Sequence, residues 1–144
     1  MTAARMRLVD EMRFPGRPEI LRDVRTYVAR RLVMELPEAA DDSRLLDDLR
    51  LLVAELSANA IKHTVSGRWR RGSFEVRMWL GANHIRMEVR DQGWWSGPRI
   101  RNDPDEIGGR GLRLVAAMAT WGVSRRWFGR VVWFEIPIEK GCAA

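Results

Sequence analysis

Two stretches of the chain repeat their apolar residues every three or four positions, the spacing of one helix face. The first runs from Pro18 to about Leu36 and stops before Pro37. The second runs from about Ser43 to Thr64, with Ser43 as the expected N-cap. Their apolar positions are Ile20, Leu21, Val24, Val28 and Leu32 in the first, and Leu45, Leu46, Leu49, Leu52, Val53, Leu56, Ala60 and Ile61 in the second. The spacing predicts two amphipathic helices.

Four other stretches are apolar at alternate positions or throughout, as expected of half-buried or buried strands. They cover residues 6–14, 74–80, 85–89 and 131–136. The turn residues Gly81 to Asn83 separate the second from the third, which predicts an antiparallel hairpin.

The segment from Trp94 to Ile107 contains two prolines and little periodicity, so it predicts a long loop that resembles a lid. Four residues, Gly108 to Gly111, then lead into a predicted helix from Leu112 to Trp121. The order of elements is strand, helix, helix, two strands, loop, helix and strand. This order predicts an α+β fold, a two-layer α/β sandwich with helices packed on one face of a mostly antiparallel mixed sheet.

A chain of 144 residues is long enough for one core, so we expect a single domain over residues 1–144. Within it we expect a lid at about 94–108 and a short tail at 139–144. No apolar run approaches the roughly 20 residues that cross a bilayer, and the first residues do not read as a secretory signal. We therefore expect a cytoplasmic protein that does not contact membranes. The one cysteine, Cys142, can form no internal disulfide.

The net charge of +6 comes almost wholly from arginine, because Lys62 and Lys140 are the only lysines. A basic surface attracts nucleic acids, nucleotides and acidic proteins alike, so charge does not choose among them. No recognition-helix pattern is evident, and direct nucleic-acid binding is therefore the least favoured function.

Three polar residues, Glu55, Asn59 and His63, recur every four positions on the second predicted helix and share one stripe. An amide oxygen can ligate a hard cation, and a carboxylate one turn away can orient or deprotonate a nucleophile. This pair is what a magnesium-nucleotide site would use. The alternative is a polar helix face exposed to solvent.

Two later segments carry further candidate chemistry. Asp91 and Gly93 lie where a predicted strand opens into a loop, and a carboxylate there could accept a hydrogen bond from the exocyclic amine of adenine. The segment Gly108 to Leu112 places backbone amides at a helix N-terminus, which is a natural phosphate site. The alternatives are a plain turn for the first segment and a hinge for the second.

These three segments read ELSANAIKH, DQG and GGRGL, and together they resemble the N, G1 and G2 boxes of the GHKL, or Bergerat-fold, ATPase superfamily. The similarity is greatest to the anti-sigma-factor serine/threonine kinase branch, whose terminal strand the closing GRVVWFEIP also resembles. The resemblance extends from the first predicted helix to Pro137.

The resemblance implies ATP and Mg²⁺ as cofactors and a role for each box. Asn59 would ligate magnesium, Glu55 would be the general base, and Asp91 would recognise adenine in a pocket shaped by Gly93. The phosphate-facing helix start would comprise Gly109, Arg110, Gly111 and Leu112. His63 matches a position that is often histidine in this branch, where capping or packing is an equally good account.

Three positions depart from the family pattern. Trp95 stands where the G1 box usually has a second glycine, and Ile107 stands where sporulation-type members have an arginine that Arg110 or Arg113 could replace. Val131 stands where a small hydroxyl residue is expected near the phosphates. Binding needs fewer of these groups than phosphoryl transfer does.

The implied function is a regulatory kinase that phosphorylates an anti-sigma-factor antagonist, sequesters a sigma factor and forms a homodimer. A catalytically weak, nucleotide-dependent protein-binding module is the alternative that the departures favour. A two-component histidine kinase domain is less favoured, because the only histidines are His63, in the N box, and His84, on a predicted strand.

Overall fold

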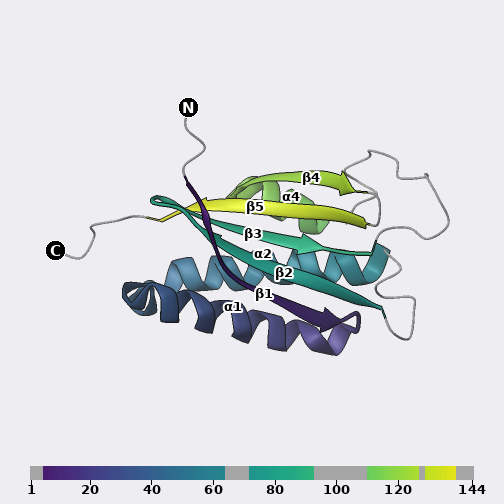
Figure 1. Cartoon of the computed structure of the whole chain (residues 1–144), viewed down its shortest axis with the longest axis horizontal. Coiled ribbons are helices and arrows are strands. Elements are labelled where there is room, and N and C mark those ends of the chain that lie inside the picture. Colours follow the sequence, from purple (N-terminus) through teal and green to yellow (C-terminus); the bar gives the residue numbers. More distant parts are fainter. Residues whose placement is uncertain (1–4, 64–71, 93–109, 127–128, 139–144) are drawn as a thin grey trace.

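The computed structural model describes residues 5–63, 72–92, 110–126 and 129–138. It consists of a five-stranded sheet with helices packed on one of its faces (Figure 1). The elements in chain order are β1 (Arg7–Pro15), η1 (Pro18–Ile20), α1 (Leu21–Glu35), η2 (Pro37–Asp41), α2 (Ser43–His63), β2 (Ser73–Leu80), β3 (His84–Arg90), α4 (Arg110–Met118), β4 (Thr120–Arg126) and β5 (Gly129–Pro137).

The strands lie in the order β1-β2-β3-β5-β4, and every pairing among the described strands is antiparallel. This arrangement confirms the predicted α+β sandwich with its mostly antiparallel sheet. No helix within the described ranges is long and apolar enough to span a bilayer.

The predictions for the first two helices, α1 and α2, are correct in position, with one correction at a cap. α2 was expected to be capped by Ser43, but the carboxylate of Asp42 accepts the Leu45 amide at 3.0 Å, and the Asp42 carbonyl accepts the Leu46 amide at 3.1 Å. Asp42 is therefore the N-cap, and Ser43 is the first helical residue. Both are good capping residues, so the sequence alone left a one-residue ambiguity.

The core forms where the apolar faces of α1 and α2 meet the alternating apolar face of the sheet. On β2 and β3 every second residue is buried, as the alternation predicted. The largest fully buried side chains are Phe74, Phe134, Leu32, Leu49, Leu52, Leu56, Met78, Ile85, Met87, Val24, Val28 and Val53.

The strand β4 is absent from the sequence-based prediction. The third helix was expected to run from Leu112 to Trp121, but it ends at Met118, and Trp121 lies in β4, paired with Phe134 of β5. Trp121 and Val123 alternate as in a strand, yet Gly122 and the arginines that follow weaken this local signal. Pairing with β5 makes the segment a strand.

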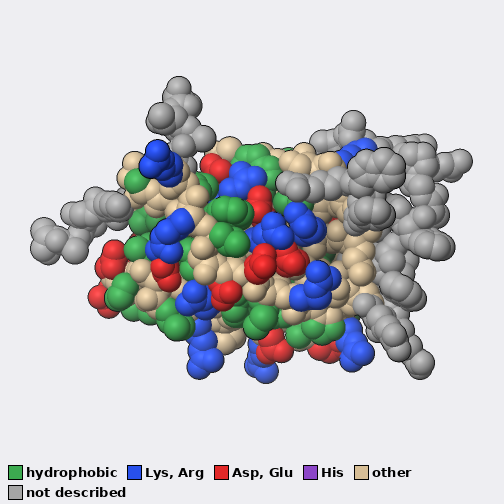
Figure 2. All heavy atoms as spheres, viewed as in Figure 1, with side chains coloured by type: hydrophobic (Ala, Val, Ile, Leu, Met, Phe, Trp, Pro, Cys, Tyr) green, Lys and Arg blue, Asp and Glu red, His purple; other side chains and the backbone are tan. Residues whose placement is uncertain are grey.

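The sheet face turned away from the helices carries mixed charges (Figure 2). Trp79 and Trp133 lie at half-buried positions that alternate with the buried ones of β2 and β5. The Trp79 indole donates to Glu88 at 2.8 Å. Arg86 donates to Glu135 at 2.9 Å and stacks on the Trp133 ring at 4.2 Å from its centroid. Both tryptophans are therefore packed sheet-face residues.

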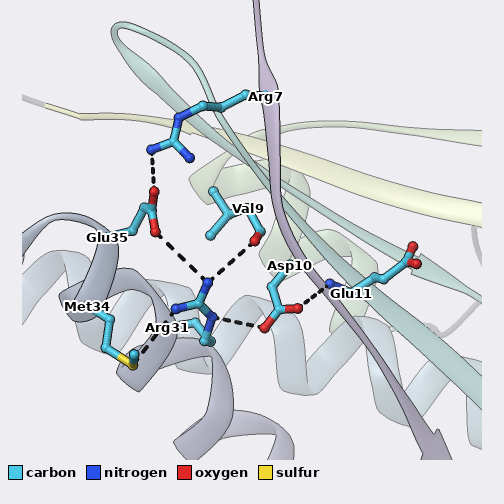
Figure 3. Close-up of polar contacts among 7 residues, drawn as sticks. All are labelled: Arg7, Val9, Asp10, Glu11, Arg31, Met34 and Glu35. Atoms are coloured by element: carbon cyan, nitrogen blue, oxygen red, sulfur yellow. Dashed lines mark hydrogen bonds and ion pairs between the residues drawn. The ribbon is translucent and has the colours of Figure 1, made fainter.

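A polar cluster joins β1 to α1 (Figure 3). Arg31 of α1 donates from Nε to Asp10 at 2.9 Å and from Nη2 to the Val9 carbonyl at 3.4 Å. Glu35, one turn further along α1, pairs with Arg31 and with Arg7 of β1. The cluster therefore ties the edge strand to the helix layer.

Two titrating groups of this cluster influence each other. The pKa of Asp10 lies below its ordinary value of 3.8, because the Tyr27 hydroxyl, the Glu11 amide and the Arg31 guanidinium stabilise the carboxylate more than partial burial disfavours it. Burial, and then the adjacent Asp10 carboxylate, raise the pKa of Tyr27. The buried Tyr27 hydroxyl makes no hydrogen bond to any of the described residues. Its effect on the pKa of Asp10 is therefore ascribed to its proximity to the carboxylate.

We expect this carboxylate to make part of the stability depend on pH. Since the pKa of Asp10 is lowered by folding, its contribution is present above pH 3.8 and is lost as the pH falls through the folded-state pKa. Denaturant unfolding of the wild type and of Asp10→Asn should therefore give a difference in free energy that is constant near neutral pH and shrinks below about pH 4. A difference that does not change with pH would contradict this role.

Candidate functional site

The candidate catalytic pair lies on α2, one helical turn apart. Asn59 is only 5% exposed, while Glu55 is half-buried. A polar helix face exposed to solvent, the alternative for this stripe, therefore does not describe Asn59. His63 is the last residue of α2, and its side chain lies outside what the structure describes. The amide is thus held inside the protein, with the carboxylate at the boundary with solvent.

The helix α2 contacts both α4 and β3, the two elements that lead to the other candidate residues. α4 begins at Arg110, so Arg110, Gly111 and Leu112 form its first turn, two residues earlier than predicted. Its fully buried Val115 anchors it in the core. The described residues do not include Gly93, Gly109 or the expected lid at 94–108, which contains Trp94, Trp95 and Ile107. The elements of the N box and the G2 box are therefore neighbours.

The carboxylate of Asp91, directly after β3, is buried and ion-paired. Arg130 Nε donates to Asp91 Oδ2 at 2.8 Å, and the Arg130 backbone amide lies 3.4 Å from Oδ1. The Asp91 amide in turn donates to the Arg130 carbonyl at 3.0 Å. The two side chains are only 1% and 4% exposed, respectively. Asp91 is therefore more than an exposed turn residue.

Sequence reasoning did not identify Arg130 as a partner of Asp91. The two residues lie 39 positions apart, and only the pairing of β3 with β5 brings them together. Val131, the next residue, is buried and paired with Arg90 of β3 and Ser124 of β4.

The close approach of the two strands depends on Gly129. This residue has a φ of 154°, and a Cβ built on it would lie 2.0 Å from the Asp91 carbonyl oxygen. Real contacts are much longer, so any side chain at this position would push the start of β5 away from Asp91.

We therefore expect Gly129→Ala to lower the free energy of unfolding by about 2–3 kcal/mol. Gly81→Ala is the matched control, because the nearest atom to a Cβ there is the flexible Met6 side chain at 3.3 Å. Its cost should stay within about 0.5 kcal/mol. Denaturant unfolding measures both, and equal costs for the two variants would refute the account of Gly129.

The donor groups of this region suit a magnesium nucleotide better than a metal held by protein alone. No group of three His, Cys, Asp or Glu side chains among the described residues could hold a metal. Magnesium commonly takes one or two protein oxygens and completes its shell with water and phosphate oxygens. The buried Asn59 can supply such an oxygen, and Asp91 can accept a hydrogen bond from a base amine.

Comparison with known proteins agrees with this arrangement of elements. The profile of a family described as the histidine kinase-like ATPase domain matches residues 14–133, which is most of the chain. The matched range includes α2, Asp91 and the start of α4. No curated protein gives a significant match. The chain therefore belongs to the histidine kinase-like ATPase domain family of the GHKL superfamily.

Proposed function

We propose that the protein is an ATP-binding regulatory serine/threonine kinase of the anti-sigma-factor type. It would phosphorylate an anti-sigma-factor antagonist and otherwise sequester a sigma factor, acting in the cytoplasm and as a homodimer. The observation that carries the proposal is the placement of Glu55 and Asn59 one turn apart on a helix that contacts α4 and β3. It is supported by the buried state of Asn59.

Each element has a role in the proposed reaction. Asp91 accepts a hydrogen bond from the exocyclic amine of adenine. The phosphates would be bound by Arg110, Gly111 and Leu112 in the first turn of α4, together with Gly109, which precedes the described part of the helix. The Asn59 side-chain oxygen would be the protein ligand of Mg²⁺. A bound magnesium ion would supply positive charge against the phosphate oxygens. Gly93, which lies outside the described residues, is assigned by the resemblance to the wall of the adenine pocket.

Glu55 acts on the acceptor. Its carboxylate takes the proton of the partner's serine or threonine hydroxyl as that oxygen bonds to the γ-phosphorus. The bond between the γ-phosphorus and the β,γ-bridging oxygen breaks, and ADP leaves with the electron pair. A half-buried position suits this role, because the acceptor belongs to another protein and must reach the carboxylate from outside.

A nucleotide-dependent binding module with little or no transfer is the second candidate. It is favoured by Val131, a buried aliphatic residue at a position where a hydroxyl near the phosphates is expected. Trp95 and Ile107 also depart from the family pattern, and these departures favour the binding module as well. Such a module would bind ATP through the same residues and use the bound state to set its affinity for a partner.

Calorimetric titration with ATP, with and without magnesium, tests the site that both candidates share. We expect ATP binding to depend on magnesium. In a separate assay, we expect the protein to transfer labelled γ-phosphate from ATP to an antagonist protein. Binding without transfer would favour the binding module. Absence of ATP binding in both conditions would contradict both candidates.

A further inference from the structure

The buried contact between Asp91 and Arg130 places a full positive charge against the carboxylate that we assign to the nucleobase. Both charged groups are removed from water, which costs free energy that the contact itself must offset. The shorter of the two contacts comes from the charged side chain, at 2.8 Å, and the longer from the neutral backbone amide, at 3.4 Å. Hydrogen bonds from charged donors are the stronger kind. Of these two donors, the guanidinium therefore makes the stronger contact with the carboxylate.

We propose that Arg130 is a positioning residue for nucleobase recognition: it holds Oδ2 of Asp91, so that Oδ1 is the oxygen that meets the base. The inference rests on the proposed ATP site and adds the residue that sets which oxygen of Asp91 faces the base. A carboxylate can accept about four hydrogen bonds, so the contacts with Arg130 are compatible with a further donor on Oδ1. Held in this way, Asp91 presents an acceptor to the amine of adenine and has no donor for the carbonyl of a 6-oxo purine.

Replacing Asp91 by asparagine makes the role of Arg130 measurable. An amide has one oxygen and one NH₂ group, and its neighbours decide which way it points. In Asp91→Asn, the guanidinium would draw the oxygen to its own side, and the NH₂ group would then meet the base. This variant should prefer inosine triphosphate, which carries an oxygen at position 6, over ATP.

A second substitution should reverse this preference. In Asp91→Asn with Arg130→Gln, the neutral glutamine can either donate or accept, so it no longer forces the oxygen to one side. The backbone amide at position 130, which the substitution keeps, then favours an oxygen at the Oδ1 position. The double variant should therefore recover a preference for ATP. A residue that only stabilises the fold would not change the sign of a base preference.

The experiment is a calorimetric titration of wild type, single and double variants with magnesium-ATP and magnesium-ITP, with thermal unfolding to verify the fold. We expect the wild type to prefer ATP by about 10- to 100-fold, the size of one charge-assisted hydrogen bond, and Asp91→Asn to prefer ITP. Arg31→Met is the matched control, because it removes an arginine that pairs with Asp10 in a different part of the protein. It should lower the melting temperature and leave the ATP/ITP ratio unchanged.

The outcomes separate this inference from the proposed function. A wild-type protein that binds neither nucleotide would contradict the proposed function. Binding of ATP by the wild type, with a preference for ATP kept in Asp91→Asn, would overturn the role of Arg130 alone. If the double variant does not fold, the single variant still decides, since its inversion supports the proposal and a retained preference for ATP refutes it.

Discussion

Asn59→Ala should abolish magnesium-dependent binding of ATP and leave the fold intact. The substitution removes the only side-chain oxygen that we assign to the metal. The magnesium ion that neutralises the phosphates would then have no ligand from the protein. We expect the affinity for magnesium-ATP to fall by at least about 100-fold, the effect of losing a hydrogen-bonding or ligand group to a charged partner. Alanine is a strong helix former, so α2 should persist.

Calorimetry measures this loss, and circular dichroism checks the helix content. The matched control is Asn83→Ala, which removes an exposed asparagine side chain in the turn between β2 and β3. This control should bind magnesium-ATP as the wild type does. An Asn59→Ala protein with unchanged affinity would remove Asn59 from the metal site.

Glu55→Gln should keep the affinity for ATP and lose transfer of the γ-phosphoryl group. Glutamine has almost the same shape as glutamate but cannot take up the hydroxyl proton, and a positioned general base contributes about 10²- to 10⁴-fold to a rate. We expect a loss of that size in transfer of labelled phosphate to an antagonist protein. The affinity for ATP should be unchanged, because Glu55 is assigned to the acceptor.

The control for this variant is Glu38→Gln, a change of the same chemistry at an exposed residue of η2. Its transfer rate should equal that of the wild type. Transfer at the wild-type rate by Glu55→Gln would show that another group takes the proton.

The parts of the fold that could be predicted depend on local patterns. The helix periods placed α1 and α2 to within a few residues, and alternation placed β1, β2, β3 and β5. β4 was missed because its short apolar pattern follows α4 after a single residue, Ala119, and reads locally as more helix. Its partner β5 follows directly along the chain, but the pairing of the two strands is a tertiary contact that helical periodicity does not show.

The same division holds within the candidate site. Spacing alone placed Glu55 and Asn59 on one helix, because a period of 3.6 residues needs no information from the rest of the chain. The partner of Asp91 could not be predicted in this way. Arg130 lies in the closing segment GRVVWFEIP, but nothing in that segment names Asp91 as its partner, and the contact exists only once β3 and β5 are paired. Tertiary contacts of this kind are invisible to periodicity.

The two ends of the proposed nucleotide site belong to different layers of the fold. Asn59 lies on α2, in the helix layer, whereas Asp91 follows β3 and is held by β5, in the sheet. A ligand that contacts both residues would therefore bind the helix layer and the sheet at the same time and hold them together. At a free concentration of 100 times its dissociation constant, the ligand would add about 2.7 kcal/mol to the free energy of unfolding. Slower amide hydrogen exchange should then appear in both layers together, because neither could separate without releasing the nucleotide.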